Sequence, residues 1–201
     1  SDVYKRQLIG FMAYGKSTVG RIIAARLGFS FVDTDDLIEL KAGKSVPAIF
    51  SEDGEEVFRQ YERTIAAELP SLRNTVIATG GGFGANQSNL ESLKTHAFVV
   101  YLWAPPEVLY ARARRLETRP LLQVADPLKR IRELLAQRTP VYQQADLLIN
   151  TADRHQQEVA DIVIMHFHTV QKSLPRLPHV QAGQKEHSHP QGNENSHSHG
   201  P

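Results

Sequence analysis

The hydrophobic residues of this chain gather in short runs that are separated by stretches with helical spacing. Residues 76–78 and 98–102 are continuous apolar runs, V-I-A and F-V-V-Y-L. Continuous runs of this length are typical of strands that are buried on both faces of a sheet. Strands are predicted at residues 8–9, 29–32, 75–79, 97–102 and 147–150.

Between these runs, apolar residues recur at helical intervals. Val19, Ile22, Ile23 and Leu27 lie on one helical face, and Gly28 after them suits a helix end. Helices are predicted at residues 17–27, 34–42, 46–51, 54–69, 87–94, 106–115, 127–144 and 155–170. The alternation predicts an α/β fold, a doubly wound, five-stranded parallel sheet flanked by helices. Functional groups are then expected beyond the carboxyl ends of the strands.

Length and composition fit one domain with a tail. The chain has 201 residues, of which 41% are hydrophobic, enough for a sizeable core. A net charge of +1 gives no reason to expect a nucleic-acid or membrane partner, and no apolar run reaches the roughly 18 residues that span a bilayer. The absence of cysteine excludes disulfides and fits a reducing compartment. We expect a cytoplasmic monomer.

The two ends of the chain differ in character from the rest. Residues 2–7, D-V-Y-K-R-Q, are one translation of a transposon mosaic end used to prepare sequencing libraries. We therefore expect residues 1–7 to be a non-native artefact and residues 8–170 to form the domain. Residues 171–201 are rich in Pro, His, Gln, Ser and Gly, a composition that cannot bury a core and predicts a disordered tail. Its His-Ser-His pairs leave loose metal binding as an alternative.

Residues 10–17, G-F-M-A-Y-G-K-S, match the phosphate-binding loop pattern G-x-x-x-x-G-K-S/T. Glycines let the backbone curl so that its N–H groups point at phosphate oxygens. Lys16 supplies positive charge to the terminal phosphates, the Ser17 hydroxyl suits Mg²⁺, and the following helix directs its N-terminal dipole at the same anion. Ala13 and Tyr14 occupy positions where many such loops carry glycine and a small residue.

Polar or glycine residues directly follow two more strands. Asp33 and Asp35 come after the second strand, where one carboxylate suits Mg²⁺ through water and the other suits a substrate hydroxyl. The alternative is helix capping by Thr34 or Asp35. Residues 79–82, T-G-G-G, follow the third strand and permit close approach of the backbone to a ligand, or form a loose turn.

Three arginines are candidates for binding anions. Arg59 shares a helical face with Glu62, so the two form either a surface ion pair or a site in which the guanidinium clamps a carboxylate. Arg119 ends an arginine-rich stretch that is typical of a lid over a transferring phosphoryl group. Arg138 lies near the end of a later helix. For each arginine a solvated surface position is the alternative.

Together these segments resemble shikimate kinase, a small member of the P-loop kinases, over residues 8–168. The matching motifs are G-F-M-x-x-G-K-S-T at 10–18, D-T-D at 33–35, G-E-E-x-F-R-x-x-E at 54–62, T-G-G-G at 79–82, R-P-L-L at 119–122 and R-x-P-x-Y at 138–142. Six motifs in this order are far more specific than any one. The resemblance implies a P-loop kinase fold with a lid segment and ATP-dependent phosphorylation of the 3-hydroxyl of shikimate, in aromatic amino-acid biosynthesis.

The resemblance also implies a role for each matching position. The residues implied to bind ATP are Gly10, Ala13, Tyr14, Gly15, Lys16, Ser17, Thr18, Arg112 and Arg119. Those implied to bind Mg²⁺ are Ser17 and Asp33. Those implied to bind shikimate are Asp35, Phe50, Phe58, Arg59, Gly80, Gly81, Gly82 and Arg138. The catalytic residues are then Lys16, Asp35 as base, and Arg119, which neutralises the migrating phosphoryl group.

Two other functions remain open on the sequence. Another small-molecule kinase of this fold, such as a gluconate kinase, shares the phosphate loop but gives no reason for two carboxylate-binding arginines. A catalytically weakened nucleotide-binding regulatory protein accounts for Tyr14 but has no use for Asp35, Arg59, Arg119 and Arg138 together.

Overall fold

The computed structural model of this chain describes residues 5–10, 16–114 and 124–173. The strands are β1 (Lys5–Gly10), β2 (Ser30–Asp33), β3 (Thr75–Ala78), β4 (Ala97–Trp103) and β5 (Leu147–Asn150). The helices are α1 (Lys16–Leu27), α2 (Thr34–Ala42), α3 (Val46–Ala48), α4 (Glu55–Glu68), α5 (Gly81–Gly84), α6 (Gln87–Lys94), α7 (Pro106–Arg114), α8 (Pro127–Tyr142) and α9 (Gln156–Ser173). The expected lid around Arg119 and residues 174–201 of the expected tail lie outside the described residues, while residues 171–173, also assigned to the tail, form the end of α9.

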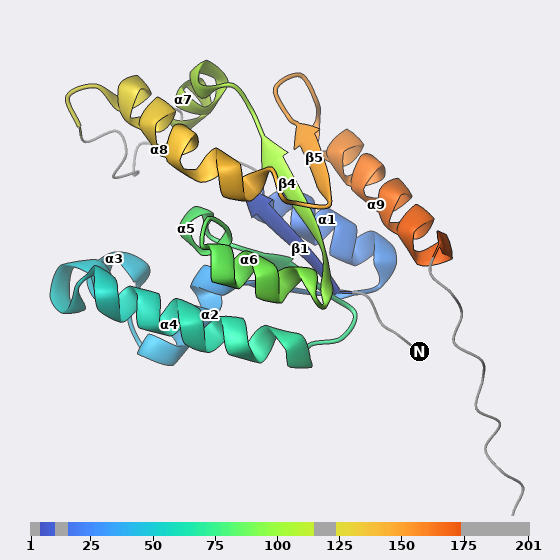
Figure 1. Cartoon of the computed structure of the whole chain (residues 1–201), viewed down its shortest axis with the longest axis horizontal. Coiled ribbons are helices and arrows are strands. Elements are labelled where there is room, and N and C mark those ends of the chain that lie inside the picture. Colours follow the sequence, from blue (N-terminus) through green and yellow to red (C-terminus); the bar gives the residue numbers. More distant parts are fainter. Residues whose placement is uncertain (1–4, 11–15, 115–123, 174–201) are drawn as a thin grey trace, which may run out of the picture.

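The strands pair in parallel in the order β2-β3-β1-β4-β5 (Figure 1). Phe31 pairs with Val76, Leu8 with Ala78, and Val100 with Leu147. Because every strand runs the same way, the carboxyl ends of all of them meet at one edge of the sheet. The D-T-D motif at the end of β2 and the T-G-G-G motif after β3 lie at that edge, where hydrogen bonds join them to the first residues of α1.

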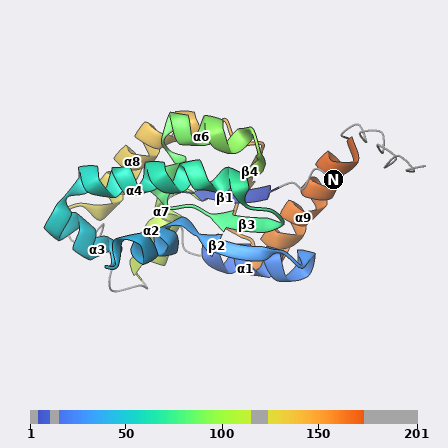
Figure 2. The same ribbon diagram turned by 90° about the horizontal axis from the view of Figure 1, so that it is seen from below.

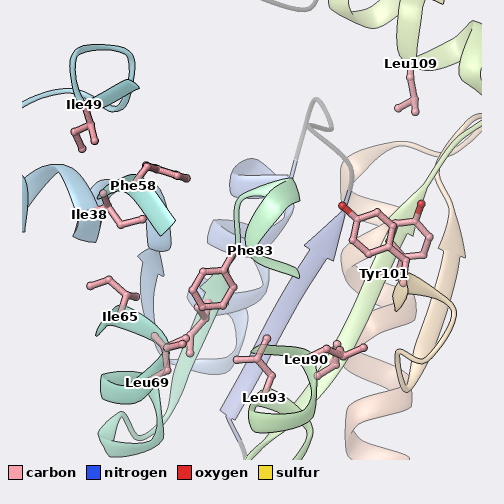
Figure 3. Close-up of a cluster of buried hydrophobic side chains, with 14 of the residues drawn as sticks. Ile38, Ile49, Phe58, Ile65, Leu69, Phe83, Leu90, Leu93, Tyr101 and Leu109 are labelled. Carbon is pink, nitrogen blue, oxygen red and sulfur yellow. The ribbon is translucent and has the colours of Figure 1, made fainter. Parts of the chain in front are cut away.

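Helices cover both faces of the sheet, as Figure 2 shows with α1 and α9 on one side and α4, α6 and α8 on the other. Alternate residues of β4 point to opposite faces, so Val100 packs with α1 and α9 while Val99 and Tyr101 pack with the other layer. Figure 3 shows the hydrophobic cluster on the side of the sheet to which Val99 and Tyr101 point. Phe83 and Leu90 belong to this cluster, with residues of α4, α6 and the sheet. The sheet is therefore buried on both faces, as its apolar runs predicted.

Three elements differ from the sequence-based expectations. The helix predicted over residues 46–51 ends as α3 and continues as a π-helical turn, η1 (Ile49–Asp53). Gly81 and Gly82, for which a loose turn was the alternative, instead wind into α5. Strand β1 begins at Lys5 rather than at residue 8, so part of the segment expected to be non-native pairs with β3 and β4.

Candidate active site

The first turn of α1 is bonded to the ends of two neighbouring strands. Lys16 is only 8% exposed, and its Nζ donates a 2.8 Å hydrogen bond to the carbonyl oxygen of Thr79, just after β3. The Ser17 hydroxyl donates a 2.8 Å hydrogen bond to Oδ2 of Asp33, the last residue of β2. Thr18, the next residue of the predicted phosphate site, is exposed. The lysine, the hydroxyl and the carboxylate thus lie at one point of the sheet edge.

Asp33 serves α1 and α2 at once. Its Oδ1 accepts a 2.9 Å hydrogen bond from the backbone N–H of Asp35 and so caps α2, while Oδ2 accepts from Ser17. The cap is therefore Asp33, not Thr34 or Asp35 as the capping alternative supposed. Two oxygen-bearing side chains, 2.8 Å apart, lie beside the helix N-terminus where phosphates bind in this class of loop.

The glycine turn after β3 leaves room for the Asp35 carboxylate. A β-carbon built on Gly80 would lie 2.8 Å from Oδ1 of Asp35, a contact too close for any side chain. The backbone N–H of Gly80 donates a 3.1 Å hydrogen bond to the hydroxyl of Thr34, which is fully buried. Close backbone approach, predicted from the three glycines, is thus used by a side chain of the protein itself.

The Asp35 carboxyl group is a weaker acid than an ordinary aspartate. Burial raises its pKa from 3.8 to about 6; the negative charge of Asp33 adds to the rise, and the ammonium of Lys16 opposes it. A carboxylate with a pKa near 6 accepts a proton more readily than an ordinary one, which suits a general base.

Arg59 of α4 is held by two carboxylates on its own helix. Its Nη1 contacts Oε2 of Glu62 at 2.6 Å, and its Nη2 contacts Oε1 of Glu55 at 2.9 Å. Glu62 is 3% exposed, so the surface ion pair considered for Arg59 and Glu62 is wrong. A β-carbon on Gly82 would lie 2.6 Å from Arg59 Nη1, which places the guanidinium against the glycine turn.

Arg138 and Tyr142 of α8 complete this part of the site. Burial raises the pKa of Glu62, while the positive charges of Arg59 and then Arg138 oppose the rise, so both arginines lie near one buried carboxylate. The hydroxyl of Tyr142, one helical turn after Arg138, donates a 2.6 Å hydrogen bond to the Gly81 carbonyl. Arg138 therefore lies near the same buried carboxylate as Arg59, on a helix whose Tyr142 is bonded to the glycine turn.

Two aromatic residues predicted at the apolar wall lie together. The rings of Phe50 and Phe58 are 4.6 Å apart between centroids, and the Arg59 guanidinium lies 5.5 Å from the Phe58 ring. Phe58 is buried, whereas Phe50, in the π-helical turn, keeps 41% of its surface exposed. An exposed aromatic face near the Arg59 guanidinium is suited to cover a ring that carries an anionic group.

Arg112 lies further along the sheet edge. Its guanidinium donates to the hydroxyl of Thr151 at 2.9 Å, to the Thr151 carbonyl, and to the Ala152 carbonyl at 3.3 Å. The arginine thus braces the loop that follows β5. Its predicted packing on adenine stays a prediction.

The structure brings together Lys16, Ser17, Asp33, Asp35, Arg59, the glycines at 80–82 and the aromatic pair. Gly10 is the last residue of β1; Ala13, Tyr14, Gly15 and Arg119 lie outside the described residues. Sequence reasoning missed four residues that hold the site: it gave no role to Thr79 and Tyr142, and it considered Thr34 only as a helix cap and Glu62 only as an ion-pair partner of Arg59. The signal for all four was their place inside a matched motif, because D-T-D, G-E-E-x-F-R-x-x-E, T-G-G-G and R-x-P-x-Y each contain one.

The described residues contain neither a cluster of metal-binding side chains nor a membrane-spanning helix. Over residues 5–10, 16–114 and 124–173, no three His, Cys, Asp or Glu side chains gather closely enough to hold a metal ion. In that same part of the chain, none of the helices combines the length and apolarity needed to cross a membrane.

Comparison with known sequences identifies close relatives. Residues 12–167 match the family model described as shikimate kinase. A shikimate kinase of Caldanaerobacter subterraneus subsp. tengcongensis is 47% identical over 157 residues, which cover 78% of this chain and 92% of the relative. A shikimate kinase of Thiobacillus denitrificans is 44% identical over 146 residues, covering 72% of this chain and 80% of the relative.

Solved structures agree with the sequences. A shikimate kinase of Acinetobacter baumannii in complex with shikimate superposes with a TM-score of 0.77 at 38% identity, covering 84% of this chain and 95% of that one. A gluconokinase of Sinorhizobium meliloti, at a TM-score of 0.55 and 16% identity over 86% of this chain and 99% of its own, shares the fold alone. The site geometry, the family model and the relatives all agree. This chain belongs to the shikimate kinase family.

Proposed function

We propose that this chain transfers the terminal phosphoryl group of ATP to the 3-hydroxyl of shikimate and so forms shikimate 3-phosphate, a step of aromatic amino-acid biosynthesis. One observation carries the proposal. The glycine turn has the carboxylate of Asp35 against Gly80 and the guanidinium of Arg59 against Gly82. A substrate with hydroxyls at one end and a carboxylate at the other fits between such groups. We assign the activity to residues 8–170.

On the acceptor side, Arg59 and Arg138 bind the shikimate carboxylate, and the exposed face of Phe50 covers the ring. The Asp35 carboxylate accepts the proton of the 3-hydroxyl. The oxygen of that hydroxyl forms a bond to the terminal phosphorus of ATP, and the bond from this phosphorus to the bridging oxygen breaks and releases ADP. Phosphoryl transfer needs little covalent help from the protein, so positioning of the hydroxyl and neutralisation of charge account for most of the catalysis.

On the donor side, the phosphates of ATP bind at the start of α1. The residues that we assign to them are Gly10, Ala13, Tyr14, Gly15, Lys16, Ser17 and Thr18. Ser17 and Asp33 fit Mg²⁺, because both present oxygen atoms and Mg²⁺ keeps its remaining positions for water and phosphate oxygens. Bound there, the ion neutralises phosphate charge. We place Arg112 at the adenine and Arg119, from the lid, at the migrating phosphoryl group.

A coupled ADP-release assay tests the proposed function. With ATP and Mg²⁺, we expect shikimate to stimulate ADP release, and gluconate and nucleoside monophosphates to give only background. Gluconate-dependent release would favour the gluconate kinase alternative. ATP binding without release for any acceptor would favour a nucleotide-binding regulatory protein.

The raised pKa of Asp35 predicts a pH dependence. As pH falls through about 6, the carboxyl group takes up a proton and can no longer accept one from the substrate. We expect kcat/KM for shikimate to fall about tenfold for each pH unit below that value. Initial rates between pH 5 and 8 check this. A profile that stays flat down to pH 5 would show that no group of this pKa limits the reaction.

Alanine substitutions at Gly80 and Gly82 test separately the contacts of the glycine turn with Asp35 and with Arg59. The β-carbon of Gly82→Ala displaces the Arg59 guanidinium, so we expect KM for shikimate to rise about tenfold with kcat little changed. The β-carbon of Gly80→Ala displaces the Asp35 carboxylate, so we expect kcat to fall instead. Steady-state kinetics of the two variants form the comparison. Identical changes in both would contradict the separate placement of acid and cation.

A further inference from the structure

The proposed function assigns no task to Tyr142, although the residue lies directly behind the glycine turn. Its side chain is 1% exposed, and its ring stacks on Tyr101 of β4 with centroids 4.5 Å apart. Its hydroxyl donates a 2.6 Å hydrogen bond to the carbonyl oxygen of Gly81. The phenol stays neutral at any pH at which the protein works, because burial raises its pKa to about 12.

The glycine turn is held from two sides by side chains that neighbour substrate-binding residues. On one side the N–H of Gly80 donates to Thr34, the residue before Asp35. On the other side the carbonyl of Gly81 accepts from Tyr142. Glycines bring no side chains of their own with which to pack, so hydrogen bonds must hold such a turn in place.

Tyr142 shares α8 with Arg138 and lies one turn after it. The phenol therefore ties the helix that carries one proposed carboxylate-binding arginine to the turn against which the other arginine, Arg59, packs. Tyr101, stacked on the far face of the ring, fixes the end of α8 to β4. A chain of direct contacts thus runs from the sheet through Tyr142 to the acceptor site.

We propose that Tyr142 is a positioning residue for the acceptor site: its hydroxyl fixes the glycine turn against α8 and thereby sets the spacing between Asp35, Arg59 and Arg138. The proposal rests on the proposed function, because it concerns how that site is held. Without the hydroxyl, the Gly81 carbonyl is left, among the described residues, with a long 3.3 Å hydrogen bond from the N–H of Ala85. A shift of a few tenths of an ångström in the turn then reaches the carboxylate and the guanidinium.

The experiment compares Tyr142→Phe with Tyr101→Phe, which removes a hydroxyl from the same aromatic stack. For Tyr142→Phe we expect KM for shikimate to rise about tenfold while KM for ATP changes less than about twofold, since the loss of one buried hydrogen bond has an effect of that order. For Tyr101→Phe we expect both constants to stay near those of the unaltered protein. Equal rises in both constants, or an unchanged KM for shikimate, would overturn the proposal.

A second pair of variants keeps the test independent of folding. At position 142, 4-aminophenylalanine retains a donor and 4-methylphenylalanine fills the same space without one. We expect the amino variant to restore KM for shikimate and the methyl variant to keep it raised. Equal KM values in this pair would overturn the proposal even if Tyr142→Phe does not fold. Failure of the proposed function is distinguishable, because the unaltered protein would then release no ADP with shikimate.

Discussion

Replacement of Asp35 by asparagine is expected to lower kcat by about 100-fold to 10,000-fold, because the variant loses the general base and cannot recover it at any pH. The same change should raise the melting temperature. The pKa of Asp35 is raised in the folded protein, so the folded state holds the proton more tightly than the unfolded chain. Stability therefore falls as pH rises from about 4 to 6, and above that window the charged carboxylate costs stability that a neutral amide does not.

Asp36→Asn is the matched control for this experiment. Asp36 is the next residue of α2, but its side chain is exposed. We therefore expect the kcat of Asp36→Asn to remain within about twofold of that of the unaltered enzyme. Single-turnover rates and thermal unfolding at pH 7.5 measure both effects. An Asp35→Asn variant that turns over normally would exclude the carboxylate as base. If Asp35→Asn were both inactive and less stable, its loss of activity would be explained by impaired folding.

Arg59→Ala is expected to raise KM for shikimate about 100-fold and to leave KM for ATP nearly unchanged, since it removes a partly buried charge that binds the substrate carboxylate. It should also lower the free energy of unfolding by about 3 kcal/mol, because the buried carboxylate of Glu62 loses the partner at 2.6 Å. The two effects have different origins, so a second substitution can separate them.

The double variant Arg59→Ala, Glu62→Gln makes that separation. We expect it to regain most of the stability, because no buried charge remains to be compensated, and to keep the raised KM for shikimate. Arg63→Ala, on the same helix, is the control. Arg63 pairs with Glu56 at 2.7 Å, but both side chains are more than half exposed, so its loss should cost less than about 1 kcal/mol. Equal losses of ATP and shikimate affinity in Arg59→Ala would contradict its assigned role.

Local sequence patterns predicted most elements well. The expected helices over residues 34–42 and 87–94 and the strand over 147–150 match the structure residue for residue. Each has a local cause: Asp33 and Asn86 cap the two helices, and the strand is an apolar run bounded by polar residues. Parallel pairing then brings the motifs at the ends of β2 and β3 to the same edge as the start of α1, which is why motifs distant in sequence could be assigned to one site.

The features that sequence reasoning missed depend on contacts between distant segments. Helix α5 consists of glycines and Phe83, a poor helix-forming sequence, and the Gly80 and Gly81 backbone is bonded to residues of α2 and α8. The burial of Glu62 depends on how α4 packs, and spacing on a helix cannot distinguish a buried pair from a surface one. The π-helical turn at Ile49–Asp53 departs from the local periodicity that predicts ordinary helix.

The hydrogen bond from Lys16 to the Thr79 carbonyl fixes the ammonium before any nucleotide binds. An ammonium has three N–H donors, so a phosphate oxygen need not displace this 2.8 Å bond. If Lys16 contacts the terminal phosphates as proposed, its side chain has little rotamer freedom left to lose when the nucleotide arrives. The carbonyl after β3 therefore prepares the charge that the phosphates would meet.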